Sequence, residues 1–335
     1  MNKFNKIKEE LRDKYKNNLV INFSPASSFR ARCEFSYQKN QYVMHGLDKK
    51  IYINKFNDAS LCIQRLMPIL LNKINNSEEI KFKLFQINFR SNQKNKIMIT
   101  LIYHKPIDDS LIDKINALSN ELGINIIIRS KNFIYGTTDL FLEDYLLYKK
   151  LIIYQTDNCF TQPNKFLVNK MIHKVIDYIN KPNDLLELYC GVGTFTLPLS
   201  FIFKNVFATE NNRDSIKCLK KSLDKNNILN IHHARLSSNE VSELINGRVF
   251  KRMNGKDIND YKFSHILLDP PRSGISSEVV ELVKSFKNII YVSCNPETYL
   301  RDINLLKKHK VKKIELFDQF PNKKHLEIVS ILEKI

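Results

Sequence analysis

Four apolar segments in the second half of the chain each end in polar residues or in a glycine turn. They are DLLELYC before GVG, NVFATE, HILLDPP and IIYVSC, and helical patterns lie between them. Strands that alternate with helices in this way predict a parallel, doubly wound sheet. Ligands of such sheets bind beyond the carboxyl ends of the strands. The sequence therefore predicts a Rossmann-like α/β domain whose site is formed by these four strand ends.

The first half of the chain has a different pattern. Short aromatic and β-branched runs between residues 29 and 56 indicate an antiparallel meander, and KFKLFQINF, NKIMITLIYH and INIIIRS indicate further strands. Helical periodicity covers residues 1–20, 58–76 and 110–122. This half is therefore expected to be an α+β domain with an antiparallel sheet.

A chain of 335 residues is long enough for two domains with separate cores. We place the boundary so that residues 1–157 form the α+β domain and residues 158–335 the Rossmann-like catalytic domain. Residues 1–24 are expected to be a leading helix that can pack on the catalytic domain.

The formal net charge of +18 has two interpretations. It favours a polyanionic partner such as nucleic acid. The chain is also rich in Lys, Asn and Ile, so part of the charge is equally explained by compositional drift. No apolar run has membrane-spanning length and the start of the chain is charged throughout, which predicts a cytoplasmic protein with no membrane partner.

The six cysteines do not form a metal-binding pattern. None is paired as CxxC, so the sequence signals neither a zinc site nor an iron–sulfur cluster, and no metal is expected. Scattered single thiols fit a reduced compartment better than a disulfide framework. The cysteines are Cys33, Cys62, Cys159, Cys190, Cys218 and Cys294.

The first two strand ends predict a cofactor site. Gly191 and Gly193 form a tight turn between a strand and a helix, but Thr196 stands where a dinucleotide fingerprint requires its third glycine. Glu210 ends the next strand, where an acid can accept hydrogen bonds from ribose hydroxyls. A surface glutamate remains the alternative for this position.

The other two strand ends carry residues that can take part in a reaction. Asp269 begins Asp-Pro-Pro-Arg, and Arg272 stands where amino-group methyltransferases carry an aromatic residue, which argues against an amine target. Cys294 ends the fourth strand just before a predicted helix start at Pro296, and the helix dipole is expected to favour its thiolate. A thiolate that adds to C6 of uracil activates C5 for methylation, after which a base removes the C5 proton. Glu327, before the apolar run in HLEIVSIL, is one candidate base among many acids.

At these residues the chain resembles the RNA uracil-C5 methyltransferases, and within them the bacterial branch that forms ribothymidine in the T-loop of tRNA. The matching segments are KLFQINF, LIYHKPID, NCFTQPN, DLLELYCGVGTF, ATE, DPPRSG, YVSCNPETYL and LFDQFP followed by HLE, and they span nearly the whole chain. The resemblance implies S-adenosylmethionine as the cofactor and an N-terminal domain that binds RNA. It implies Cys294 as nucleophile, Glu327 as proton acceptor, and cofactor contacts from Gln162, Tyr189, Gly191, Gly193, Thr194, Glu210 and Asp269.

The RNA contacts carry alternatives. Phe85 in KLFQ is similar to the aromatic that inserts into the T-loop, and a core strand aromatic is the other interpretation. Arg30 and Arg32 are candidate phosphate contacts. Thr194 departs from the asparagine common at its position in the family, and Lys323 and Lys324 replace less basic residues.

The absence of a four-cysteine cluster favours tRNA over ribosomal RNA, because the ribosomal branches of the family carry one. We therefore expect a monomeric enzyme that methylates the tRNA T-loop and possesses some affinity for other RNAs with a T-loop-like fold. Two alternatives remain: an rRNA uracil-C5 methyltransferase without the cluster, and a non-catalytic tRNA-folding chaperone.

Overall fold

The computed structural model describes residues 3–46, 49–253, 255–321 and 323–335, and the chain divides into two compact units. Unit 1 contains Met1–Ser24, Leu146–Ile153 and Cys159–Ile335, and unit 2 contains Pro25–Tyr145 and Tyr154–Asn158. The N-terminal segment therefore belongs to the unit that holds the four predicted strand ends.

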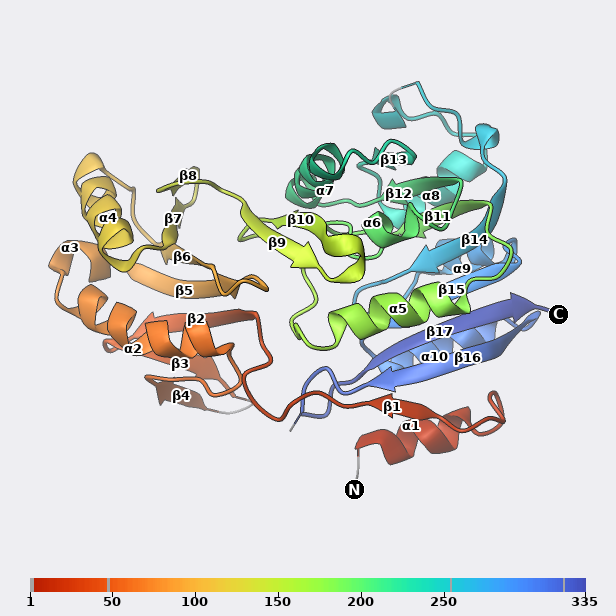
Figure 1. The fold of residues 1–335 in the computed structure, drawn as a ribbon, viewed down its shortest axis with the longest axis horizontal. Helices are drawn as coiled ribbons and strands as arrows, with labels where there is room; N and C mark the ends of the chain where they lie inside the picture. Colours follow the sequence, from red (N-terminus) through yellow and green to blue (C-terminus); the bar gives the residue numbers. More distant parts are fainter. Residues whose placement is uncertain (1–2, 47–48, 254, 322) are drawn as a thin grey trace. The chain divides into compact units, whose positions relative to one another are not determined.

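The eight-stranded sheet of unit 1 has the order β1-β16-β17-β15-β14-β11-β12-β13 (Figure 1). Neighbouring strands are parallel except that β17 is antiparallel to β15 and β16. From β11 the chain builds the sheet first toward β13 and then in the other direction through β14, which creates the reversal of strand order where ligands bind. The strands are β1 (Val20–Asn22), β11 (Asp184–Leu188), β12 (Asn205–Thr209), β13 (Ile231–Ala234), β14 (Phe263–Leu268), β15 (Asn288–Ser293), β16 (His309–Phe317) and β17 (Glu327–Lys334).

Helices cover both faces of this sheet. Buried side chains of α1, α8, α9 and α10 share one hydrophobic cluster with the sheet, whereas α5 crosses the opposite face from α10 (Figure 1). The helices of unit 1 are α1 (Lys3–Leu11), α5 (Val168–Tyr178), α6 (Thr196–Leu199), α7 (Arg213–Asn226), α8 (Ser238–Ile245), α9 (Ser277–Lys284) and α10 (Pro296–Leu305), with 3₁₀ turns at Tyr148–Lys150, Lys251–Met253 and Ile258–Asp260.

The helix predicted over residues 1–20 is wrong in its second half. α1 ends at Leu11, its last buried position, and Val20–Asn22 instead form β1 beside β16. Pairing with a sheet edge has overridden a weak helical pattern that contains Asn17 and Asn18, both poor helix formers.

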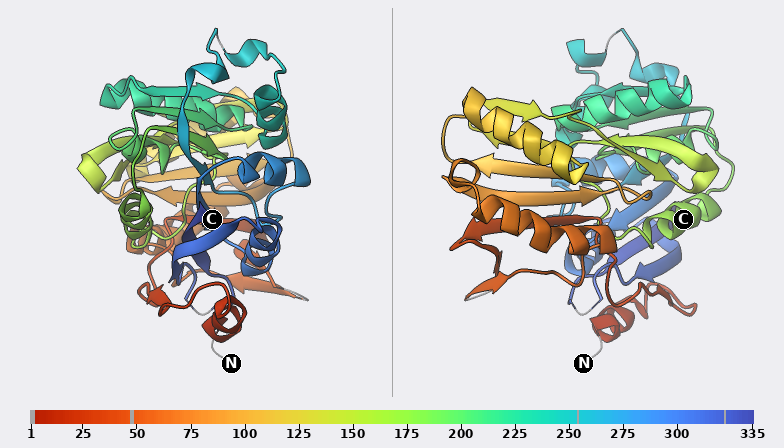
Figure 2. Two further views of the ribbon diagram at one scale, coloured as in Figure 1. Left: turned by 90° about the vertical axis from the view of Figure 1, so that its right-hand side faces the viewer. Right: turned by 60° about the vertical axis from the view of Figure 1, so that its left-hand side comes forward.

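Unit 2 is built on a seven-stranded sheet of order β4-β3-β2-β5-β6-β7-β8. The predicted antiparallel arrangement is confirmed for every neighbouring pair except β6–β7, which is parallel because α4 returns the chain between them. α2 and α4 cover one face (Figure 2). The elements are β2 (Arg32–Gln38), β3 (Gln41–His45), β4 (Lys50–Ile53), α2 (Leu61–Asn75), α3 (Glu78–Lys81), β5 (Leu84–Ser91), β6 (Ile97–Tyr103), α4 (Asp109–Leu122), β7 (Asn125–Ser130) and β8 (Phe133–Gly136).

The chain passes between the units after Ser24, within β9 (Leu142–Leu146), within β10 (Leu151–Gln155) and after Asn158. Within the described part of the chain, every helix is too short or too polar to cross a membrane.

Candidate active site

The carboxyl ends of β11, β12, β14 and β15 meet at one edge of the eight-stranded sheet, as predicted. The registers place Leu188 beside Thr209 and Leu268. β17 runs in the opposite direction, so its first residue lies at the same edge. The structure thereby gathers eight of the predicted residues there: Tyr189, Gly191, Gly193, Thr194, Glu210, Asp269, Cys294 and Glu327.

The exit from β11 is strained at Tyr189. This residue has a φ of +61°, a left-handed conformation that costs a non-glycine residue about 1–3 kcal/mol. Its hydroxyl donates a hydrogen bond to Ser238 Oγ at 2.8 Å, which holds the ring against the sheet. Strain of this kind is concentrated in ligand-binding loops, and no feature of the sequence revealed it.

The two glycines of the turn have different roles. Both have positive φ, +56° at Gly191 and +96° at Gly193. A Cβ at Gly193 would lie 2.6 Å from Leu219 Cδ1, so this glycine lets the turn pack on α7. A Cβ at Gly191 would meet only Phe160 O at 4.0 Å, so this glycine leaves open space beside the turn. Gly191 is therefore the one that a ligand can approach, and Thr194 follows it half-buried.

Glu210 is tied to the glycine turn. Its Oε2 accepts the Gly191 N–H at 3.1 Å, and its Oε1 accepts the Asn212 N–H at 2.7 Å. Two backbone donors fix the carboxylate at the end of β12. Each oxygen retains acceptor capacity, which suits it to a pair of ribose hydroxyls.

Asp269 is approached by a chain of two side-chain amides. Gln162 Nε2 lies 3.4 Å from Asp269 Oδ2, and Gln319 Nε2 donates to Gln162 Oε1 at 2.9 Å. Burial raises the pKa of Asp269 to about 7, and the charge of Glu210 adds to this while the Gln162 amide opposes it. Gln319 thus orients Gln162, a function that its place in LFDQFP did not disclose.

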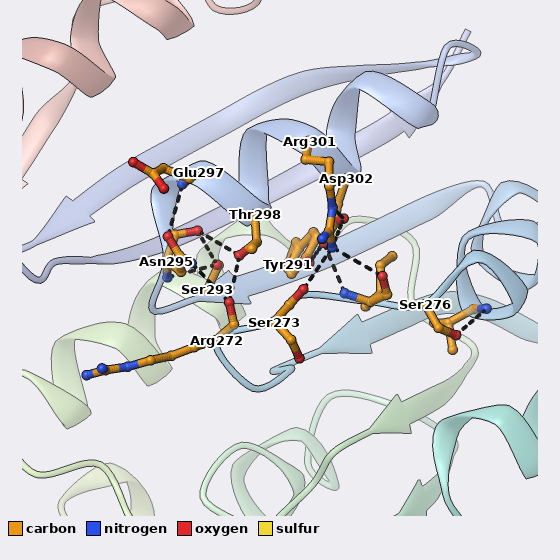
Figure 3. A network of polar contacts seen from close by, with 12 residues as sticks. Arg272, Ser273, Ser276, Tyr291, Ser293, Asn295, Glu297, Thr298, Arg301 and Asp302 are labelled. Carbon is orange, nitrogen blue, oxygen red and sulfur yellow. Dashed lines mark hydrogen bonds and ion pairs between the residues drawn. The ribbon is translucent and has the colours of Figure 1, made fainter.

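The loop after Asp269 is fastened to the first turns of α10 (Figure 3). The carbonyl oxygen of Arg272 accepts hydrogen bonds from Asn295 Nδ2 at 3.0 Å and from Thr298 Oγ1 at 3.2 Å. Farther along α10, Asp302 accepts hydrogen bonds from the Tyr291 hydroxyl at 2.6 Å and from the N–H of the loop residue Ile275 at 3.1 Å. The Arg272 side chain points away from this network, so the contacts fix its backbone and leave its guanidinium extended.

Cys294 follows the last residue of β15, and α10 begins at Pro296 as predicted. The expected bias toward thiolate is opposed by the surroundings of Cys294, since burial and the charges of Glu327 and Asp269 raise the pKa of the thiol to about 11. Arg272 lowers this pKa but does not compensate. The Glu297 N–H at the start of α10 also donates its hydrogen bond to Asn295 Oδ1. The helix start therefore offers one N–H fewer to a thiolate at Cys294.

Glu327 lies beside Cys294 by strand register. Ser293 pairs with Ile328 across the antiparallel strands β15 and β17, so Cys294 and Glu327 are the next residues along each strand. Glu327 is 3% exposed, and its Oε2 has no hydrogen-bond partner among the residues that the structure describes. Burial and the charge of Asp269 hold the pKa of this carboxyl well above its usual range.

Glu187 is a further acid that the sequence did not single out. It lies within β11 at 1% exposure, and burial raises its pKa to about 8. It looked like one residue of an apolar strand, and only its burial near Asp269 marks it as unusual.

The predicted RNA contacts lie in unit 2. Phe85 is 39% exposed, not a core residue, and its ring stacks on His104 with centroids 4.1 Å apart. The sequence did not single out His104, although it stands in the matching segment LIYHKPID. Arg32 donates to Glu34 Oε1 at 2.7 Å, and the Arg30 guanidinium lies over the Phe56 ring.

No cluster of three or more histidine, cysteine or acidic side chains is placed to hold a metal ion in the described ranges. The chemistry that the site offers is carried by a thiol, carboxyl groups of raised pKa and a guanidinium.

Comparison with known proteins agrees with this arrangement. The family model of tRNA (Uracil-5-)-methyltransferase matches residues 1–335. The tRNA/tmRNA (uracil-C(5))-methyltransferase of Campylobacter concisus is 38% identical over 340 residues, which cover 98% of this chain and 92% of the relative. The enzyme of the same name from Campylobacter lari is 40% identical over 316 residues, covering 91% of this chain and 90% of the relative.

A solved structure shares the fold. The tRNA (uracil-54, C5)-methyltransferase of Pyrococcus abyssi, in complex with S-adenosyl-L-homocysteine, superposes with a TM-score of 0.77 at 21% identity and covers 98% of this chain and 82% of that one. The full-length family match and the identity to the curated relatives lead to one conclusion. The chain belongs to the tRNA (uracil-5-)-methyltransferase family.

Proposed function

We propose that this protein is a cytoplasmic, S-adenosylmethionine-dependent tRNA (uracil-C5)-methyltransferase that forms 5-methyluridine in the T-loop. The observation that carries the proposal is the neighbouring position of Cys294 and Glu327 at the sheet edge, a nucleophile and an acid on adjacent strands. Family membership supports the reaction, and the curated relatives carry its name.

The residues at the edge fit this cofactor. The fixed Glu210 carboxylate can accept ribose hydroxyls, and Gly191 leaves open space next to it. The acids Asp269 and Glu187 have raised pKa values, and a cation placed near them favours their charged forms. When bound, S-adenosylmethionine supplies a cationic sulfonium with an electrophilic methyl group.

The residues of the chain then divide the reaction into steps. The Cys294 sulfur bonds to C6 of the uracil, and the electron pair of the C5–C6 double bond moves to C5. C5 would take the methyl group of the bound cofactor, whose sulfur–methyl bond breaks and whose sulfur keeps the electron pair. The Glu327 carboxylate removes the C5 proton, the C6–S bond breaks, and the double bond returns.

The charges around Cys294 and Glu327 affect how readily these two groups lose their protons. Burial raises the pKa of the Cys294 thiol and of the Glu327 carboxyl. A cation in the site lowers both pKa values, because it favours the thiolate and the carboxylate. A cofactor cation bound near these groups would therefore favour the reactive forms of the nucleophile and the base.

Unit 2 is the candidate RNA-binding domain. The exposed Phe85–His104 stack offers an aromatic surface to an unstacked base, worth about 1–3 kcal/mol per base. Arg30 and Arg32 remain candidate phosphate contacts. Other RNAs with a T-loop-like fold are candidate substrates, and the names of the curated relatives point to tmRNA among them.

The test is nucleoside analysis after incubation of an unmodified tRNA transcript with methyl-labelled S-adenosylmethionine. We expect labelled 5-methyluridine at one T-loop position, and none when that uridine is replaced by cytidine. Label in an rRNA fragment but not in tRNA, or in a nucleoside other than 5-methyluridine, contradicts the proposal. Unlabelled tRNA that is nevertheless refolded by the protein indicates a chaperone.

A further inference from the structure

Lys3 holds the segment that leads into Glu327. Its ammonium group forms an ion pair with Asp318 and donates hydrogen bonds to the carbonyl oxygens of Phe320 at 2.9 Å, Lys323 at 3.0 Å and His325 at 3.2 Å. The side chains of Lys3 and Asp318 are only 15% and 11% exposed. Four acceptors separated from Lys3 by more than 310 residues of sequence thus converge on one cation.

The segment held in this way connects β16 to β17, the strand that begins with Glu327. It follows Phe317, the end of β16, and enters β17 at Glu327. The Asp318 N–H donates to Asn22 O at 2.8 Å, and Gln319 donates to Gln162. The ion pair with Asp318 therefore adds to contacts that already fix the start of the segment, whereas the hydrogen bonds from Lys3 to the Lys323 and His325 carbonyls hold the stretch closest to Glu327.

Lys3 is carried by an anchored helix. Phe4, Ile7 and Leu11 of α1 are buried in the hydrophobic cluster that also contains Leu326, the residue before Glu327. The Phe4 ring also packs edge-on against Phe23 with centroids 5.9 Å apart. A cation on a rigid element can position a loop more precisely than a cation on a mobile one.

We propose that Lys3 is a positioning residue for proton removal: its ammonium holds Asp318 and the backbone carbonyls of Phe320, Lys323 and His325 so that the Glu327 carboxyl reaches C5 of the substrate. This inference rests on the proposed role of Glu327. Misplacement of a catalytic group by about 1 Å costs on the order of 100-fold in the step that it serves. Loss of Lys3 slows proton removal, while attack by Cys294 and methyl transfer, which use groups on other strands, continue.

The test measures two quantities in single-turnover reactions with methyl-labelled cofactor: the labelled protein–RNA complex that survives denaturant, and the free methylated RNA. Lys3→Met removes the charge and the donors but keeps the side-chain length. Lys6→Met is the matched control, because Lys6 lies on the same helix and its ion pair, with Glu297, is exposed. Lys3→Arg tests rescue by a retained cation.

We expect Lys3→Met to accumulate at least about tenfold more labelled covalent complex than the wild type, with methyl transfer at an unchanged rate. Lys6→Met is expected to match the wild type, and Lys3→Arg to lie between. Equal loss of complex and product in Lys3→Met, or behaviour identical to Lys6→Met, overturns the inference. Asp318→Asn, which weakens the same ion pair from the other side, is expected to show the same accumulation and serves if Lys3→Met does not fold.

Glu327→Gln, examined in parallel, separates this inference from the proposed function. Accumulation in Glu327→Gln without accumulation in Lys3→Met and Asp318→Asn refutes the role of Lys3 alone. Absence of accumulation in Glu327→Gln refutes the role of Glu327 itself.

Discussion

Arg272 lowers the pKa of the Cys294 thiol, against the charges of Glu327 and Asp269, which raise it. Hydrogen bonds to the Arg272 carbonyl oxygen fix the backbone that carries this cation, while its side chain extends away from the network (Figure 3). The nucleophile therefore lies between two acids and one cation, and its reactivity depends on the balance among them.

Replacing Arg272 by Gln is expected to raise the thiol pKa further and to slow alkylation of Cys294 about threefold at pH 9, since an exposed cation is partly screened by solvent. The measurement is the rate of iodoacetamide labelling of the Cys294 peptide by mass spectrometry. Arg272→Lys, which keeps the charge, is the control. Faster labelling in Arg272→Gln contradicts this assignment.

Asp269→Asn is expected to stabilise the protein while weakening cofactor binding. The pKa of this carboxyl is raised from 3.8 to about 7 in the folded protein. Between these values the folded protein binds more protons than the unfolded chain, so the wild-type carboxyl lowers stability as the pH rises through that window. The asparagine of the variant does not titrate, so the variant keeps the stability that the wild type loses as the pH rises. Each 1 kcal/mol gained in the free energy of unfolding raises Tm by about 2–4 °C.

Thermal unfolding at pH 4 and pH 8 tests this prediction. The Tm advantage of Asp269→Asn should be near zero at pH 4 and fully developed at pH 8. A variant that is less stable than the wild type at pH 8 shows that the Asp269 carboxylate is stabilised, not penalised, by its surroundings.

Gly274→Ala is expected to destabilise the protein more than Gly123→Ala. Both glycines have positive φ, +75° and +61°, but a Cβ at Gly274 would lie 2.4 Å from Asp302 Oδ2, whereas a Cβ at Gly123 has open space. Left-handed strain alone costs about 1–2 kcal/mol, and the clash adds displacement of a hydrogen-bonded carboxylate. Urea unfolding of both variants separates the two contributions, and equal losses would show that the loop tolerates the extra carbon.

Phe85→Ala is expected to weaken tRNA binding by about 5- to 150-fold, the equivalent of one base stack, and to leave cofactor binding unchanged. Phe133→Ala is the matched control, because both phenylalanines of unit 2 are 39% exposed and only Phe85 stacks on His104. Filter binding of labelled tRNA provides the measurement. An equal effect of the two substitutions would remove Phe85 from the RNA surface.

The sequence predicted the elements of the site better than its electrostatics. α7 (Arg213–Asn226) is one of the helices expected between the strand segments, and it forms because Asn212 caps its start and its apolar positions repeat regularly. The strand-end motifs were found because a parallel sheet gathers its carboxyl ends at one edge. β13, which follows α7, was not among the predicted strands, and it and α8 are only four and eight residues long. Elements this short carry little periodicity.

The relations that depend on tertiary structure could not be read from the chain. The insertion of β17 between β15 and β16 sets Glu327 beside Cys294, and no local pattern encodes that order. The raised thiol pKa depends on the burial and the acids around Cys294, and the role of Gln319 depends on a contact with Gln162 across 157 residues. Motif spacing and the family resemblance thus supplied Cys294 and Glu327 as candidates, whereas their burial and their neighbouring positions required the fold.

The central claim is that Cys294 bonds covalently to the target uracil, and the most direct measurement uses a tRNA transcript that contains 5-fluorouridine. A base can remove a proton from C5 but cannot remove fluorine in the same way, so the last step of the reaction is blocked. The methylated covalent complex should therefore persist in denaturant. We predict a complex with the wild-type protein whose digested peptide carries methylated fluorouridine on Cys294, and no complex with Cys294→Ala. A stable complex with Cys294→Ala, or attachment to another residue such as Cys190, would contradict the account.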